Sequence, residues 1–371
     1  MLFLGSVDTF DARKAMWHSL FSMPGLGKKF GAFVIDTDGE MCNEINRLAS
    51  EFGKFSDIVV CSPKNPDFRH DFLSQRFSPH HISHRALAMK IDESPAGLDP
   101  FWSHAAENML SHLISIYRYV ENHFIASKSC HGAIPPLSWQ VIDDMVRVAK
   151  SLWQEELSTK HKVGFGNPSI PASNGIEYLV MQYRELLKTI PPDESAKEHL
   201  HYFENSLSAT NPRMRLSVCK SVIRLLTPFQ TKDFSVLTNT THLTDFPAAI
   251  AMGRIFYIPL CDFQDRTSAL AFARGLKIDV FSDLFDSAKN SPVDKHTPLI
   301  YCCGDEAAMI YSSLTAADES TIIKLGVQIN CVPIFIIESV ATFCEKVYSS
   351  VAKDILWEIE TRLFSSAKLF A

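Results

Sequence analysis

The sequence lacks the features that mark a membrane-spanning or secreted chain. No apolar run reaches the ~18 to 20 residues that a bilayer-crossing helix needs, because Arg254 interrupts the run 248–260 and Glu338 interrupts the run 331–343. The first residues contain no basic segment and soon reach aspartates, so no signal peptide is expected. The nine cysteines are an odd number without CxxC spacing, which favours a reduced chain over a disulfide framework. We therefore expect a cytoplasmic protein without a transmembrane span.

The sequence also lacks an excess of positive charge. It contains 36 basic and 42 acidic residues, and the formal net charge of -6 argues against a protein that coats nucleic acid over its whole surface, but not against a local basic groove. It has no repeat of fixed period and no low-complexity tract. With 371 residues, 46% of them hydrophobic and 21% charged, the composition is that of an ordinary globular chain of about two or three units.

Short apolar segments occur in two groups, one in each end of the chain. They are residues 1–4, 32–35, 58–61, 255–260, 299–303 and 332–337. Their nearly continuous apolar character is typical of central strands in a parallel sheet that helices cover on both faces. The sequence therefore predicts the α/β fold class.

Between these groups the sequence has the periodicity of amphipathic helices. Asp99 and Pro100 are typical of a helix start, and apolar residues then recur at steps of three and four over 102–124. Ser138 is suited to cap a second helix, and further apolar stripes cover 176–187 and 218–225. We expect an all-α insert at 97–225 that divides the sheet domain into the segments 1–96 and 226–371.

The segment 299–306 carries the sharpest local signal for chemistry. Its apolar strand ends in the adjacent carboxylates Asp305 and Glu306. In P-loop NTPases an aspartate at this place orients hydrated Mg²⁺, and a following glutamate polarises the attacking water. A strand that ends in Asp-Glu is common by itself, so its interpretation depends on the rest of the sequence.

A phosphate loop should then follow the first strand, where Gly5 stands. The pattern GxxxxGK[ST], read from Gly5, places Phe10 at the second glycine, Asp11 at the lysine and Ala12 at the Mg²⁺-binding hydroxyl. A carboxylate where an ammonium group should meet phosphate turns attraction into repulsion. We expect weak or absent hydrolysis and no tightly bound cofactor. We also expect residues 305–306 to end a central strand next to the loop after residues 1–4, on one edge of the sheet.

The strand at 332–337 is followed by Glu338, where RecA-like motors place a polar sensor of the γ-phosphate, often glutamine. This sensor-like glutamate is the third departure around one nucleotide site. Together the three departures argue against ordinary ATP hydrolysis.

In their order along the chain these segments resemble the TraG/TraD-type coupling proteins of type IV secretion and conjugation systems. The matching segments are 33–40, 99–110, 226–229, 253–260, 303–307 and 335–339. The resemblance implies a RecA-like P-loop NTPase sheet with an inserted all-α domain, in a family of hexameric, DNA-translocase-like ATPases. Thr37 and Asp38 replace the family's Pro-Lys, and the sequence contains no counterpart of the membrane-anchoring helices that precede the family's phosphate loop.

The resemblance and the degenerate loop together lead to a functional expectation. We expect a coupling-protein-like component of a type IV secretion or conjugation system, acting as a scaffold or substrate-recruiting subunit with lost or weak ATP hydrolysis. One alternative is an active DNA-translocating ATPase that uses ATP and Mg²⁺ with an atypical phosphate loop. Another is a standalone regulator that binds proteins on a RecA-like platform. The expected partners are secretion components and further subunits in a homo- or hetero-oligomer, which would bring the chain to the inner membrane peripherally.

Basic residues cluster near the end of the expected insert. They are Arg213, Arg215, Lys220 and Arg224. Such a run is suited to contact a phosphate backbone weakly or to act as an arginine finger, although most charge runs are solvated helix faces.

Histidines cluster between the strand at 58–61 and the expected insert. They are His70, His80, His81 and His84. No cysteine or carboxylate accompanies them at a fixed ligand spacing, so we expect solvated or capping roles and no metal site.

Overall fold

The fold is described from a computed structural model of the chain. The described residues are 2–4, 9–22, 30–65, 67–89, 100–127, 135–159, 175–189, 194–290, 297–304, 309, 318–337, 343, 356 and 362–364. The chain divides into two compact units. The sheet unit comprises 1–72, 91–95 and 231–371, and the helical unit comprises 73–90 and 96–230. The insert boundaries at 97 and 225 stay a prediction.

A seven-stranded sheet forms the centre of the sheet unit. Its strands are β1 (Leu2–Leu4), β2 (Gly31–Asp36), β3 (Ile58–Val60), β4 (Ile255–Pro259), β5 (Leu299–Cys303), β6 (Cys331–Ile337) and β7 (Arg362–Phe364). Their order is β3-β4-β2-β5-β6-β1-β7, and every pairing is parallel. The α/β class is confirmed.

The apolar runs become central strands because both of their faces are buried. Every residue of β2, β4 and β5 is buried. All six expected strands are present, whereas β7 was not expected. Its three residues, Arg-Leu-Phe, are too short and too polar to carry a period-two signal.

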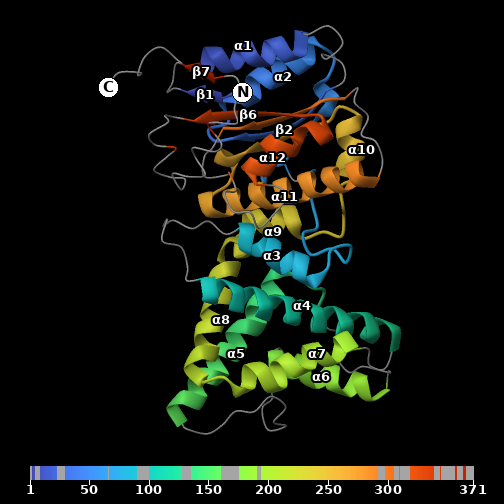
Figure 1. The fold of residues 1–371 in the computed structure, drawn as a ribbon, viewed down its shortest axis with the longest axis vertical. Coiled ribbons are helices and arrows are strands. Elements are labelled where there is room, and N and C mark those ends of the chain that lie inside the picture. The colour runs from blue at the N-terminus through green and yellow to red at the C-terminus, as the bar shows by residue number, and fades with distance from the viewer. Residues whose placement is uncertain are drawn as a thin grey trace. The chain divides into compact units, whose positions relative to one another are not determined.

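Helices cover both faces of the sheet. Helices α1 (Thr9–Ser22) and α2 (Glu40–Glu51) lie on one face, and α11 (Arg266–Asn290) and α12 (Glu319–Leu325) lie on the other (Figure 1). The remaining elements of the unit are η1 (Phe55–Asp57), α9 (Lys232–Thr238), α10 (Phe246–Ala251), η4 (Leu260–Asp262) and η6 (Gly326–Ile329).

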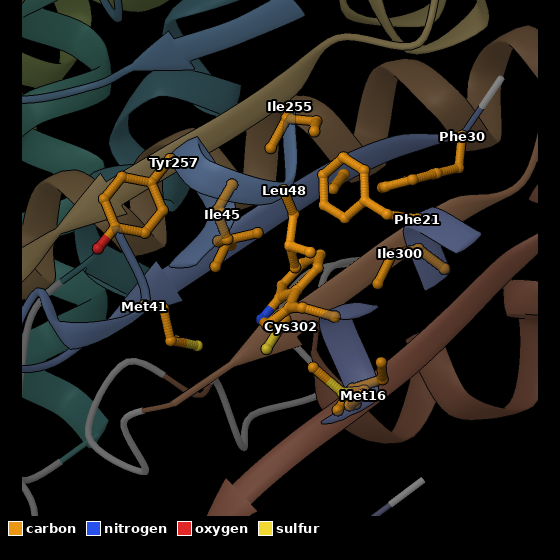
Figure 2. Packing of buried hydrophobic residues seen from close by; sticks show 14 of the residues in the cluster. Met16, Phe21, Phe30, Met41, Ile45, Leu48, Ile255, Tyr257, Ile300 and Cys302 are labelled. Carbon is orange, nitrogen blue, oxygen red and sulfur yellow. The ribbon is translucent and has the colours of Figure 1, made fainter. Parts of the chain in front are cut away.

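The alternation of side chains along β2 distributes its residues between the two layers. Val34 joins a buried cluster with Phe21 of α1 and Leu48 of α2, and Figure 2 shows residues of these helices packing against the sheet. Phe33 points to the opposite layer, where its ring centroid lies 6.5 Å from that of Phe281 in α11. Each fully buried side chain of this size contributes about 1.5–3 kcal/mol, so both layers hold the sheet.

In its described residues the helical unit consists of helices and their connections. They are α3 (Pro79–Met89), α4 (Pro100–Ser127), α5 (Trp139–Thr159), α6 (Ile176–Thr189), α7 (Glu194–His201), the π-helical turn η2 (Tyr202–Leu207), α8 (Pro212–Leu226) and η3 (Thr227–Gln230). Helix α4 packs against α3, α6 and α8, and α5 packs against α6 and α8.

The helix starts follow the expected signals. Helix α4 begins at Pro100, whose missing N–H is not needed in a first turn. Ser138 precedes α5, and its Oγ accepts a hydrogen bond from the Val141 N–H at 3.2 Å. None of the helices in the described ranges is long and apolar enough to cross a membrane.

Candidate functional site

The carboxyl ends of the strands meet at one edge of the sheet, because all strand pairs are parallel. This edge contains the ends of β1 and β5, as the sequence predicted. The two strands are not neighbours, however, since β6 lies between them. Residues 305–306 and the loop after β1 lie outside the described residues, so the expectation that they lie next to each other stays a prediction. Local sequence carries no signal for the order in which strands pair.

Several predicted site residues fall outside the described residues. These are Gly5, Asp305, Glu306 and Glu338. Their neighbours are described: Leu4 ends β1, Gly304 follows β5 and Ile337 ends β6. The functions predicted for the four residues stay predictions.

The predicted phosphate loop leads into a helix, as such loops do. Helix α1 begins at Thr9, so the backbone of Phe10, Asp11 and Ala12 forms its first turn. Free N–H groups at a helix start attract anions. The functions predicted for Phe10, Asp11 and Ala12 stay predictions.

The described part of the edge is organised around Asp36, the last residue of β2. Its side chain is 1% exposed. Oδ2 accepts hydrogen bonds from the Met41 N–H at 3.0 Å and from the Tyr257 hydroxyl at 2.5 Å. Asp36 thereby caps the first turn of α2, whose own N-cap residue, Gly39, has no side chain to do so.

The Asp36 carboxyl group is incompletely satisfied. Within the described part of the chain, its Oδ1 is buried and has no hydrogen-bond partner. Burial raises the pKa of Asp36 from 3.8 to about 6, against the opposing effect of the Tyr257 hydrogen bond. This buried acid therefore changes its protonation close to neutral pH.

The turn after Asp36 is tied to the segment that enters Asp305. The Thr37 hydroxyl donates to the Gly304 carbonyl at 2.8 Å, and the Gly304 N–H donates to the Ile35 carbonyl at 2.9 Å. A Cβ on Gly304 would lie 3.2 Å from the Ile35 oxygen, so the close approach of β2 and β5 favours glycine there.

A second set of hydrogen-bonded polar side chains connects the segment after β4 with the segment after β3. Asp262 follows β4, and it accepts from the Ser62 hydroxyl and the Lys64 ammonium group, each at 2.6 Å. The carboxylate raises the pKa of Lys64. Because Lys64 is bound to Asp262, it is not positioned in this structure as a phosphate-binding lysine.

Sequence reasoning did not select Asp36, Tyr257 or Asp262 as site residues. Asp36 follows the same pattern as Asp305, an acidic residue at the end of an apolar strand. The pattern was interpreted as a site only at Asp305. Tyr257 and Asp262 gave no local signal, because their partners are 221 and 200 residues away in the chain.

The basic run lies on α8 of the helical unit, but it does not form one face. Arg213, Lys220 and Arg224 are exposed, and their spacing of seven and four residues places them on one stripe. Arg215 is 4% exposed and its guanidinium lies 5.4 Å from the centroid of the Trp153 ring. The stripe thus contains three cations.

Comparison with known proteins supports the fold. No protein-family model matches the sequence, and no curated protein sequence is significantly similar to it. The chain is similar in structure to the bacterial conjugative coupling protein TrwBdeltaN70 in its unbound form, with a TM-score of 0.52, 11% identity, and coverage of 98% of this chain and 68% of that chain.

Two further solved structures are similar. One is the plasmid coupling protein TrwB in complex with the GTP analogue GDPNP, with a TM-score of 0.51, 11% identity, and coverage of 98% and 70%. The other is VirB4 of Thermoanaerobacter pseudethanolicus, with a TM-score of 0.47, 13% identity, and coverage of 99% and 77%. The fold is the RecA-like P-loop fold that the sequence predicted.

Proposed function

We propose that the protein is a coupling-protein-like component of a type IV secretion or conjugation system, in which it acts as a scaffold or substrate-recruiting subunit. The observation that supports this proposal most is the likeness to TrwB over 98% of this chain, which extends across both units. The segments that carry the family resemblance, from 33–40 to 335–339, are also in the family order.

The chemistry of the loop after β1 supports weak or lost ATP hydrolysis. Two unit charges ~4 Å apart interact by ~4 kcal/mol at an effective dielectric constant of ~20. A micromolar site has only ~8 kcal/mol of binding free energy in total, so reversing that charge removes a large part of it. Asp11 in place of the lysine makes this reversal.

A magnesium-ATP titration by calorimetry, at physiological salt, tests the proposal. The wild-type chain should show no micromolar binding. The triple variant Phe10→Gly/Asp11→Lys/Ala12→Thr restores GxxxxGK[ST] and should bind more tightly. Asp286→Lys is the matched control, because it makes the same charge change at a residue with 69% side-chain exposure on α11. Tight binding by the wild type would contradict the proposal and favour an active translocase.

Weak DNA binding belongs to the same proposal. Its cations would be Arg213, Lys220 and Arg224, which release about three counterions, so log affinity should fall with log salt at a slope no steeper than about -3. Filter binding between ~50 and ~200 mM salt measures this slope. Nanomolar binding at the upper limit would favour the translocase over the scaffold.

Co-purification with secretion components separates the scaffold from the standalone regulator. A scaffold should assemble with them or with further copies of itself, whereas a standalone regulator should not. The same assembly would bring the chain to the inner membrane peripherally.

A further inference from the structure

Two histidines of the helical unit contact each other directly. His112 lies on α4 and His199 lies on α7, and their Nδ1 atoms are 2.9 Å apart. This is a hydrogen-bond distance, so one ring donates its Nδ1–H and the other ring accepts through an unprotonated Nδ1. The contact therefore exists only while at least one of the two imidazoles is neutral.

A tyrosine ring extends this contact to the following turn of the chain. The Tyr202 ring stacks on that of His112, with centroids 4.1 Å apart and planes inclined by 15°. Tyr202 begins the π-helical turn η2, and turns of this kind are rare and frequently occur at functional sites. Through His112, α4 thus contacts both α7 and η2.

We propose that His112 and His199 form an acid-sensitive contact that holds α7 and η2 on α4 at neutral pH and releases them when both rings are protonated. A second proton would place two N–H donors opposite each other at 2.9 Å, with no acceptor between the two rings. Both rings would also carry a positive charge, and like charges at this distance repel. Acidification should therefore open the contact.

The surroundings of His112 oppose its protonation. Burial and the nearby His199 lower the pKa of His112 from 6.5 to about 4, against the opposing effect of the Glu198 carboxylate. Because the folded value is below the unfolded one, the neutral ring contributes stability that is complete above pH 6.5 and lost as pH falls towards 4. The contact is therefore closed at neutral pH and weakens between these two values.

Other charged and titratable groups lie on the elements that surround this contact. They include His80 and His84 of α3, Tyr183 and Arg184 of α6, Lys197 and Glu198 of α7, Glu204 of η2, and Arg215 and Cys219 of α8. The two α3 histidines lie against Glu107, and Arg184 binds Glu204. Tyr183 contacts Tyr119, Arg215 lies over Trp153, and Cys219 acts on Tyr202. Glu198 is the carboxylate that acts on His112, and its effect is already part of the lowered pKa.

Hydrogen exchange of the full chain, followed by mass spectrometry at pH 7.5 and at pH 5, tests the proposal. Exchange of the segment 194–207, corrected for the intrinsic effect of pH on exchange, reports the opening of α7 and η2. From the two pKa values of His112, the opening equilibrium should shift towards the open state by about 30-fold at the lower pH. The proposal is independent of the proposed function, since it involves neither nucleotide nor partner.

His112→Phe is the test variant, because phenylalanine retains a ring to stack on Tyr202 and cannot be protonated. His123→Phe is the matched control. His123 is another half-buried histidine of α4 that stacks on a tyrosine, Tyr119, at 4.1 Å, but its Nδ1 donates to the Tyr119 carbonyl and not to an imidazole. The pH effect on the segment 194–207 should disappear in His112→Phe and remain in His123→Phe.

An NMR titration of the histidine rings in the wild type needs no variant, and it decides the matter if His112→Phe does not fold. The His112 ring should titrate well below pH 6.5, near pH 4. Titration near pH 6.5 would overturn the proposal. So would exchange of the segment 194–207 that does not respond to pH, a pH effect that persists in His112→Phe, or its loss in His123→Phe.

Discussion

The described residues of the sheet unit contain two buried pairs of a tyrosine and a carboxylate, and the two pairs differ in their surroundings. At the carboxyl edge, the Tyr257 hydroxyl donates to Asp36 at 2.5 Å. On the α11/α12 face, the Tyr301 hydroxyl donates to Glu319 at 2.9 Å. Glu319 also forms an ion pair with Lys277 at 2.5 Å, and both side chains are fully buried. Asp36 has no ion pair in the described residues.

The two pairs differ in the role that we assign to them: Tyr301–Glu319 is a structural pair, and Tyr257–Asp36 belongs to the candidate functional site. The Lys277 ammonium group compensates the charge of Glu319, so this pair joins α11 to the start of α12 under β5. In the described residues the Asp36 carboxylate accepts from an N–H and a hydroxyl group, and burial together with the nearby charge of Asp38 raises its pKa to about 6. In both pairs, burial raises the pKa of the tyrosine. The comparison teaches that, in the described residues, the unit pairs the buried Glu319 with a cation and leaves the buried Asp36 at the carboxyl edge of the sheet without one.

Removal of the compensating charge should have the largest effect. Lys277→Met leaves Glu319 as an unpaired buried charge, and loss of one partner of a buried pair costs about 3–5 kcal/mol. Urea unfolding followed by circular dichroism measures the change in the free energy of unfolding.

The double variant Lys277→Met/Glu319→Gln is the control for this prediction. It removes both charges and keeps an acceptor for the Tyr301 hydroxyl, so most of the stability should return. If the double variant were as unstable as Lys277→Met alone, packing of the lysine and not its charge would explain the loss.

Asp36→Asn should have the opposite sign and depend on pH. The amide retains an acceptor for Met41 and Tyr257 and removes the buried charge. Because the folded pKa is about 6 and the unfolded value is 3.8, the protonated carboxyl contributes stability that is complete below pH ~4 and lost as pH rises to about 6. At pH 7.5 the variant should be more stable than the wild type by up to ~3 kcal/mol.

Unfolding measured at pH 4 and at pH 7.5 checks this prediction. The two proteins should have nearly equal stability at the lower pH and differ at the higher one. A stability difference that is the same at both pH values would mean that burial of charge is not its cause.

Gly39→Ala should have the smallest effect on stability of the three. It tests how much the conformation of the turn beside Asp36 contributes to the free energy of unfolding. Gly39 has φ of +78°, and a Cβ there would lie 2.7 Å from Cys261 Sγ. An alanine in this left-handed conformation lowers the free energy of unfolding by about 1–2 kcal/mol. The close contact with the thiol adds to that loss.

Gly53→Ala provides the comparison for that cost. Gly53 has φ of +70°, but a Cβ there would meet nothing within 4 Å. Urea unfolding should therefore show a smaller loss for Gly53→Ala than for Gly39→Ala. Equal losses would show that backbone strain alone matters at both positions.

Much of the fold could be predicted from the sequence, because its signals are local. The apolar runs at 32–35, 255–260 and 299–303 predicted buried parallel strands, and Pro100 and Ser138 predicted helix starts. The candidate site was predictable only as an edge of the sheet. Its described centre, Asp36, stood within a segment used for the family resemblance and was not recognised as a site residue.

The sequence by itself determined the α/β class, six of the seven described strands, the helices that begin at Pro100 and after Ser138, and the replacement of the phosphate-loop lysine by Asp11, since each depends on neighbours a few residues away. Only the tertiary structure decided that β6 separates β1 from β5 and that Arg215 is buried while Arg213 is exposed. It also brought Thr37 into hydrogen-bond contact with Gly304, which is 267 residues away in the sequence. It also decided which buried acid receives a lysine and which receives none. These outcomes depend on how helices and strands pack, and residues far apart in the chain acquire their electrostatic environment only when that packing removes water from around them.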